Sequence, residues 1–437
     1  TKLEVNHLIS KVATLLGIFL VLITFLGVFG APWLIYISAP GFISDPDKFQ
    51  LTVNLLQITF PYIFFISLVS MAGGVLNTYG KFIVPAFTPV WLNVSFIIGA
   101  LYFAQNFEEP IKVLAWAVFF GGALQLFFQI PFLKQIGCLP KFNLDLKDKG
   151  VWKILKLMGP AVLGVSIMQI SLLINTIFAS FLASGSVSWL YYADRLMEFP
   201  AGVLGVALST ILLPNLSKSF SKKNTVGYSE LINWGLKFGV LLAVPAAVAL
   251  AILAVPLIST LFYYGAFTQK DILMTQYALI AYSIGLVGLI LIKILAPAFY
   301  AQQNVKTPVK IALFTLFCTQ FMNLIFIGYL KHTGLALAIG LGACINAGLL
   351  FYHLRKGKIF KLGDGWLMFL LKIIFASFIM ALGLFYFKGT VDLWVNYSAL
   401  YRFAHLISLI FFGAALYFTT LRLCKLDISE FFKKNIQ

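Results

Sequence analysis

Apolar runs of about 20 residues recur along the whole chain, and no other feature of the sequence constrains the fold as much. A helix needs about that length to cross the hydrocarbon core of a bilayer, and a water-soluble core does not need it repeatedly. Of the 437 residues, 61% are hydrophobic and only 11% are charged, and the mean hydropathy is +0.95. The sequence therefore predicts an all-α, polytopic membrane protein.

Polar loops and basic clusters divide the chain into about twelve expected transmembrane helices. These cover roughly residues 8–37, 50–78, 82–104, 111–133, 157–183, 186–213, 231–262, 272–300, 309–329, 333–353, 365–387 and 400–422. The longest polar stretch, residues 134–156, separates the first four spans from the last eight. The first span lacks the pattern of a cleaved signal peptide, so we expect it to be retained.

The formal charge of +17 is explained by the distribution of basic residues among the loops. If the spans alternate in direction, the loops on the N-terminal side carry 24 of the 32 Lys and Arg residues, and the opposite loops carry 6. The remaining two, Arg195 and Lys293, lie well inside spans, whereas cations nearer the ends of spans are counted with the adjoining loops. The positive-inside rule places both ends of the chain in the cytoplasm, and no nucleic-acid partner is expected.

Three charged residues interrupt the sixth span. On a helix, Tyr191, Asp194, Arg195 and Glu198 follow the i, i+3, i+4 spacing that brings side chains to one face. Ionisable groups at bilayer depth cost roughly 2.5–3.5 kcal/mol each on insertion scales, and they usually face a partner or a wet cavity. Two interpretations stay open: Arg195 binds an anion, or the three charges neutralise one another.

Signatures of soluble enzymes and metal sites are absent from the sequence. There is no phosphate-binding loop, no HExxH, no GxSxG and no nucleotide-binding glycine fingerprint. The four cysteines and four histidines are dispersed, without metal-ligand or disulfide spacing. We therefore expect no metal and no other cofactor, and we expect a protein that is not an enzyme. Proline-broken spans with polar residues at mid-depth are typical of a transporter.

Several stretches of the chain carry a family resemblance. The longest runs from Asn175 to Pro214, and Ala31-Pro-Trp, Phe60-Pro-Tyr, Pro89-Val-Trp-Leu-Asn and Lys306-Thr-Pro-Val-Lys310 accompany it. In this order they resemble the MurJ (MviN) family of bacterial lipid II flippases, in its proteobacterial form. That family belongs to the multidrug/oligosaccharidyl-lipid/polysaccharide (MOP) exporter superfamily, and the resemblance extends over essentially the entire chain.

The resemblance implies a two-lobe transporter fold around a central cavity. Residues 1–135 would form four helices of a partial N-terminal lobe, and residues 136–156 a cytoplasmic connector. Residues 157–353 would form the six-helix C-terminal lobe, and residues 365–424 two extra helices that make a lipid groove. The chain would then begin at the third helix of the family. Some relatives bind sodium through an acid at the position where Asn175 stands here, so a sodium site is not expected.

The resemblance also implies a function, which is to flip lipid II from the inner to the outer leaflet of the cytoplasmic membrane by alternating access, for cell wall synthesis. The diphosphate of lipid II favours a planar guanidinium, which can bind two oxygens at once. Arg195 matches the cavity arginine of the family, and Asp194 and Glu198 match its acidic neighbours. Lys293 and Lys372 are further candidate contacts, although either ammonium could instead reach an interface as an ordinary anchor.

Beyond lipid II, the expected partners are membrane lipids and proteins of cell wall synthesis. Two other functions stay open. One is export of another polyprenyl-linked glycan or a drug, as in other members of the superfamily. The other is a membrane enzyme that uses polyprenyl phosphates, which would need a carboxylate in a sizeable loop.

Overall fold

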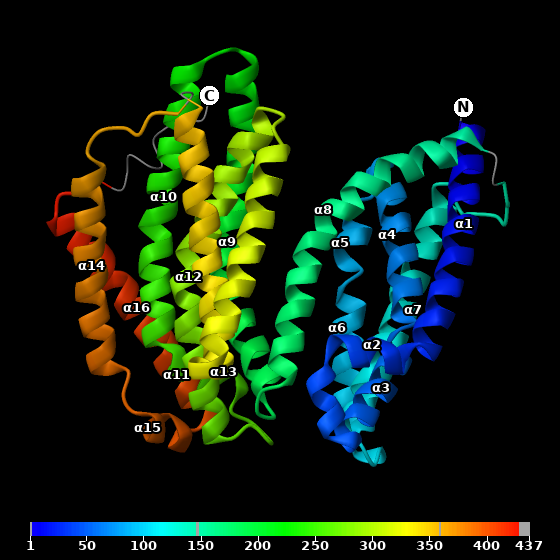
Figure 1. Ribbon diagram of the computed structural model, residues 1–437, viewed down its shortest axis with the longest axis horizontal. Coiled ribbons are helices and arrows are strands. Elements are labelled where there is room, and N and C mark those ends of the chain that lie inside the picture. The colour runs from blue at the N-terminus through cyan, green and yellow to red at the C-terminus, as the bar shows by residue number, and fades with distance from the viewer. Residues whose placement is uncertain (1, 146–147, 358–359, 428–437) are drawn as a thin grey trace. The chain divides into compact units, whose positions relative to one another are not determined.

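The computed structural model describes residues 2–145, 148–357 and 360–427, and every element within these ranges is helical (Figure 1). Residues 146–147 of the expected connector and 358–359 of the basic loop after the tenth span lie outside the described residues. The chain forms two compact units, Thr1–Phe181 and Leu182–Gln437. The expected all-α class is confirmed.

The first unit combines three long helices, α1, α7 and α8, with shorter helix segments, several of which begin at or next to prolines. Its elements are α1 (Lys2–Phe29), α2 (Ala31–Ser38), η1 (Pro40–Ser44), α3 (Pro46–Thr59), α4 (Tyr62–Thr78), α5 (Ile83–Phe87), α6 (Val90–Ile98), η2 (Gly99–Phe103), η3 (Ala104–Asn106), α7 (Ile111–Gln135) and α8 (Lys149–Ser180). Proline lacks the N–H of the helix ladder and clashes with the preceding turn. For this reason the first expected span divides at Gly30, next to Pro32, and the second divides next to Pro61.

The second unit contains the longer helices. They are α9 (Ser186–Ser221), α10 (Thr225–Ile252), α11 (Ala254–Phe262), α12 (Gln269–Ala301), α13 (Lys306–Lys356), α14 (Trp366–Phe387), α15 (Val391–Asn396) and α16 (Ala399–Leu423). Helix α9 keeps Pro200 and Pro214 in its interior and extends beyond the expected span. A single proline removes only one hydrogen bond, and spanning helices tolerate it where neighbours satisfy the freed carbonyl.

Among the described residues there are fewer separate helices of spanning length than the expected twelve, and two elements account for the difference. In the described part of the chain, ten helices are long and apolar enough to cross a membrane. One of them, α13, contains two expected spans joined at Lys331, whose φ of 53° and ψ of −130° interrupt the helix. The other element is α8, which covers the expected fifth span. It is not among the ten because, in the described part of the chain, its apolar segment is the shorter Gln169–Ser180.

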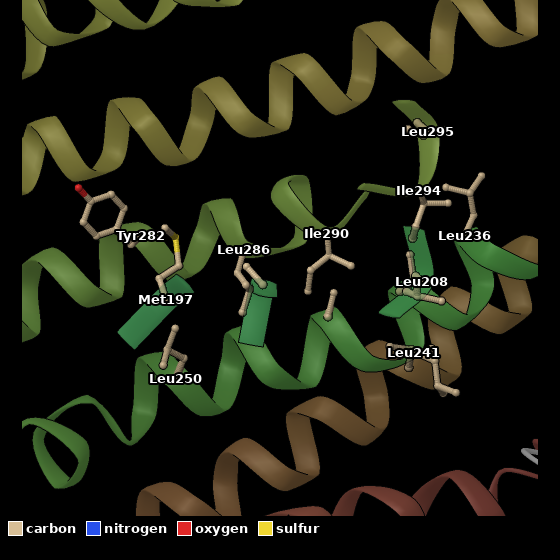
Figure 2. Close-up of a cluster of buried hydrophobic side chains, with 14 of the residues drawn as sticks. Met197, Leu208, Leu236, Leu241, Leu250, Tyr282, Leu286, Ile290, Ile294 and Leu295 are labelled. Atoms are coloured by element: carbon tan, nitrogen blue, oxygen red, sulfur yellow. The ribbon is translucent and has the colours of Figure 1, made fainter. Parts of the chain in front are cut away.

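The main hydrophobic core lies between α9, α10 and α12 of the second unit (Figure 2). The core side chains shown there include Met197, Leu208, Leu236, Leu241, Leu250, Leu286, Ile290 and Ile294, all of them buried. Helices α12 and α13 approach even more closely. A Cβ added to Gly285 would lie 2.3 Å from Cα of Gly340, so the two backbones touch directly. Such contacts between small residues are typical of membrane helices.

The last two long helices, α14 and α16, are attached to α10. The buried Tyr417 hydroxyl of α16 donates a hydrogen bond of 2.7 Å to the carbonyl of Leu241. That carbonyl needs an outside donor because Pro245, four residues later, has no N–H to give it. Toward the start of α10, Asn233 Oδ1 accepts hydrogen bonds from Gly363 N (2.9 Å), in the linker before α14, and from Nε1 of Trp366 (3.1 Å), the first residue of α14.

The boundary between the units differs from the expected boundary between the lobes. Helix α8 falls in the first unit, where it lies against α2 and η1. The Ser180 hydroxyl accepts a hydrogen bond of 3.0 Å from the Gly41 N–H. The sequence assigns this helix to the C-terminal lobe, and the lobe assignment stays a prediction.

Candidate functional site

Arg195 and Glu198 form an ion pair on α9. Arg195 Nη1 lies 2.5 Å from Glu198 Oε2, and the guanidinium carbon lies 5.0 Å from the centre of the Tyr191 ring. Both charged side chains are open to their surroundings, with 53% and 59% of their surface exposed. Arg195 follows the first residue of α9, Ser186, by nine residues, which is about 14 Å along the helix at a rise of 1.5 Å per residue. A paired but accessible guanidinium is thus present within a helix that is long and apolar enough to cross a membrane.

Asp194 points elsewhere, although the sequence pattern places it with the other charges. It is half-buried, and the described residues give it neither an ion pair nor a hydrogen bond. Its electrostatic neighbour outside α9 is Tyr282, a buried residue of α12. Successive residues of a helix are about 100° apart, and this rotation directs Asp194 toward α12 while Arg195 faces outward. The expected four-residue face therefore holds Tyr191, Arg195 and Glu198.

Lys293 packs against α9. It belongs to α12 and is exposed, and a Cβ added to Gly205 would lie 2.9 Å from its Cγ. Its aliphatic stem therefore crosses α9 at a glycine. Gly205 follows Glu198 by two helical turns, about 10 Å. Between them, a Cβ added to Gly202 would find no other atom within 4 Å. The structure thus packs Lys293 against α9, two turns beyond Glu198.

Lys372 has a different environment on α14. Its ammonium donates a hydrogen bond of 3.2 Å to the carbonyl of Lys425, just beyond the end of α16. No described contact joins it to the Arg195–Glu198 pair. The position suits an anchor between the two C-terminal helices at least as well as a ligand contact.

The sequence pattern does not single out Arg402, which is buried on α16 with 6% of its surface exposed. It stands just inside an expected span, so it is grouped there with the loop cations. Its Nη1 donates to the carbonyls of Ser259 (2.7 Å) and Tyr263 (3.3 Å). Its guanidinium carbon lies 5.4 Å from the centre of the Tyr263 ring and 5.1 Å from that of Tyr264. An arginine within the first turn of an apolar span is the signal that could have identified it.

In the described ranges, no group of three or more His, Cys, Asp or Glu side chains is arranged to hold a metal ion. Two apolar cavities, of about 310 and 350 Å³, are lined by residues of the first unit. Neither is lined by any of the charged residues discussed above.

Comparison with known proteins gives a consistent result along the chain. The family model described as "Lipid II flippase MurJ" matches residues 2–404. "Lipid II flippase MurJ" of Burkholderia cenocepacia is 46% identical over 417 residues, which are 94% of this chain and 81% of the relative. "Probable lipid II flippase MurJ" of Buchnera aphidicola is 42% identical, over 99% of this chain and 84% of the relative.

Solved structures agree in fold. The structure named "Lipid II flippase MurJ, inward closed conformation" superposes with a TM-score of 0.76 and 26% identity, covering 96% of this chain and 85% of that one. An inward-facing multidrug resistance MATE family transporter of the MOP superfamily gives a TM-score of 0.65 at 15% identity, which is a likeness of fold alone.

Proposed function

The chain belongs to the family of MurJ lipid II flippases, and from that premise we propose that it carries lipid II from the inner to the outer leaflet of the bacterial cytoplasmic membrane. It is a multi-pass membrane protein and a transporter rather than an enzyme. The observation that carries the proposal is the family match over residues 2–404. The accessible Arg195 within a helix of spanning length supports it independently.

Arg195 is the proposed diphosphate-binding residue. Its guanidinium can bind two phosphate oxygens at once, and each such charge-assisted bond is stronger than a neutral one. In the structure one nitrogen of the guanidinium, Nη1, is paired with Glu198 Oε2 at 2.5 Å. An incoming diphosphate would compete with that carboxylate, so binding exchanges one anion for another. An exchange of this kind keeps the bound state from becoming too stable and allows the ligand to leave.

The other candidate residues have separate proposed roles. Lys293, two turns along α9, would add a second cation for the diphosphate or the sugars. Lys372 would lie near a lipid phosphate at the end of the α14–α16 pair. Asp194 would influence Arg195 only through its charge, because it makes no direct ion pair with it in the described part of the chain.

The charge asymmetry of the loops supports a cytoplasmic location for both ends of the chain. Alternating access through helices broken at prolines would move the polar head group through a wet cavity, while the polyprenyl tail remains in lipid or in an apolar groove. Membrane lipids and proteins of cell wall synthesis are the further proposed partners.

The test replaces Arg195 in cells depleted of their native flippase, with the amount of membrane protein measured in parallel. We expect Arg195→Ala to abolish lipid II transport while the protein still accumulates. Arg195→Lys should lose most of the activity, because a point charge does not reproduce two-oxygen binding. The control is the triple variant Asp194→Asn, Arg195→Ala, Glu198→Gln, which removes the whole charged group. If this variant accumulated normally and supported growth, the three charges would only neutralise one another.

A further inference from the structure

We infer that Arg402, on the C-terminal helix α16, positions the tyrosines beside Arg195 near the start of α9. This inference rests on the proposed function, because it assigns a second arginine to the same site. Arg402 would touch no ligand. It would act through the turn between α11 and α12, which lies between the two arginines in a series of contacts, all of them inside the second unit.

The first contact in the series joins Arg402 to the end of α11. The last carbonyls of a helix have no partner within it, and a cationic side chain can satisfy them. Arg402 does so from another helix, by donating to Ser259 O and Tyr263 O. The guanidinium also lies against the rings of Tyr263 and Tyr264. This turn is therefore fixed to α16 by hydrogen bonds and by cation–π contacts together.

Helix α11 depends on such contacts because it is not a continuation of α10. The two helices are separated at Leu253, whose φ of −85° and ψ of 14° are not helical, and Pro256 follows within the first turn of α11. The backbone alone therefore does not determine the direction in which α11 runs. Its position is set by what packs against it.

Aromatic contacts extend the series to α9. The Tyr192 ring lies 4.6 Å from that of Phe262 and 5.5 Å from that of Phe267, which are the residues on either side of the turn. The neighbouring ring of Tyr191, 6.0 Å from that of Tyr192, lies under the guanidinium of Arg195. Edge-to-face and tilted ring pairs of this kind are directional, so a displaced turn would displace Tyr192.

A purely structural role for Arg402 is the alternative, and Tyr417 provides the matched control. Tyr417 also belongs to α16 and also donates to a carbonyl of the helical body, that of Leu241. It takes no part in the aromatic series that leads to Arg195. Tyr417→Phe should weaken the attachment of α16 without displacing the turn, whereas Arg402→Met should do both.

The first measurement is the affinity of the purified protein for lipid II, with thermal stability recorded beside it. Arg402→Met should weaken binding about tenfold, and Arg402→Lys should recover most of the loss because an ammonium can still reach both carbonyls. Tyr417→Phe should leave binding within about twofold of the unchanged protein. Tyr192→Leu should weaken binding, and adding Arg402→Met to it should cost little more, since both act through one turn. Fully additive losses, or equal losses in Arg402→Met and Tyr417→Phe, would overturn the inference.

The second measurement needs no ligand, so it separates this inference from the proposed function. 3-Fluorotyrosine replaces Tyr192, and its ¹⁹F signal is recorded for the protein in detergent. Arg402→Met should shift or broaden this signal, and Tyr417→Phe should leave it unchanged. If the signal does not respond to Arg402, the inference is wrong whatever the protein binds. If the signal responds but the unchanged protein does not bind lipid II, the contact series stands and the proposed ligand is wrong.

Discussion

At the scale of single residues, Lys293 combines a packing role with a charge. Its stem lies across Gly205, two turns beyond Glu198 on α9, and the residue is exposed. Long cationic side chains often cover apolar surface in this way while the charged end reaches water. The packing and the charge can be separated by substitution, because methionine has a similar stem and no charge.

We predict that Lys293→Met accumulates like the unchanged protein but transports lipid II about tenfold more slowly, since a charge-assisted hydrogen bond is worth roughly 1.5–3 kcal/mol. Lys293→Arg should keep most of the activity. Transport into the outer leaflet, normalised to protein amount, is the measurement. Full activity in Lys293→Met would mean that only the stem matters.

At the scale of elements, the connector after α7 is bound along α1. Asn6, Ser10 and Thr14, spaced four residues apart, bind main-chain groups of Gly137, Lys141 and Asn143 at 2.7, 3.1 and 2.9 Å respectively. Lys11, on the same helix, reaches Asp145 and Asp148 at 2.9 and 2.7 Å. Asp148 is also the N-cap of α8 and accepts from Gly150 N and Val151 N. One carboxylate thus joins the start of α8 to α1.

This arrangement predicts a pH dependence of stability. The hydrogen bond from Lys11, and after it that from the Val151 N–H, holds the pKa of Asp148 below its ordinary value. A carboxyl group whose pKa is lowered by folding stabilises the folded protein at pH values above its ordinary pKa of about 3.9. This stabilisation is lost as the pH falls through the lower pKa of the folded state. Asp148→Asn keeps a capping oxygen but has no proton to bind in this range. Its unfolding temperature should therefore fall less than that of the unchanged protein between pH 7 and pH 3.

The control is Asp364→Asn, at an exposed carboxylate to which the described contacts assign no hydrogen bond and no ion pair. It should follow the unchanged protein at both pH values. Equal falls in the Asp148 and Asp364 variants would show that the contact between Lys11 and Asp148 contributes nothing to the acid response.

At the scale of the whole molecule, the direction of insertion follows from the loops. The cytoplasmic side predicted by the basic residues contains the end of α9, and the opposite side contains the short acidic turn before α7. We predict that a cysteine at Lys218 reacts with a membrane-impermeant thiol reagent only from the cytoplasm, and one at Glu108 only from outside. The four native cysteines are replaced first, since they are free in the structure. Reversed labelling would overturn the orientation.

The sequence alone determines that this protein lies in the membrane, that it is all-helical, and which family it belongs to. This information lies in the apolar runs of spanning length that recur along the chain and in the order of the local motifs. Both can be read from consecutive residues. Arg195 and Glu198 are found in the same way, because helical spacing brings them together. Which side of α9 faces α12, and therefore whether Asp194 or Arg195 is turned toward that neighbour, depends on how the helices pack, and the spacing of the residues does not give it.

Only the tertiary structure decides which distant groups meet. The carbonyl freed by Pro245 finds the hydroxyl of Tyr417, 176 residues later. In the sequence, Arg402 looks like a cation at the edge of a loop, but in the structure it is buried and caps the end of α11. The sequence does not reveal this role because its partners, Ser259 and Tyr263, lie more than a hundred residues before it. A buried donor must have an acceptor, but the sequence does not say where that acceptor lies. The physical reason is that such pairs form only when helices have packed, and packing joins residues without regard to their separation along the chain.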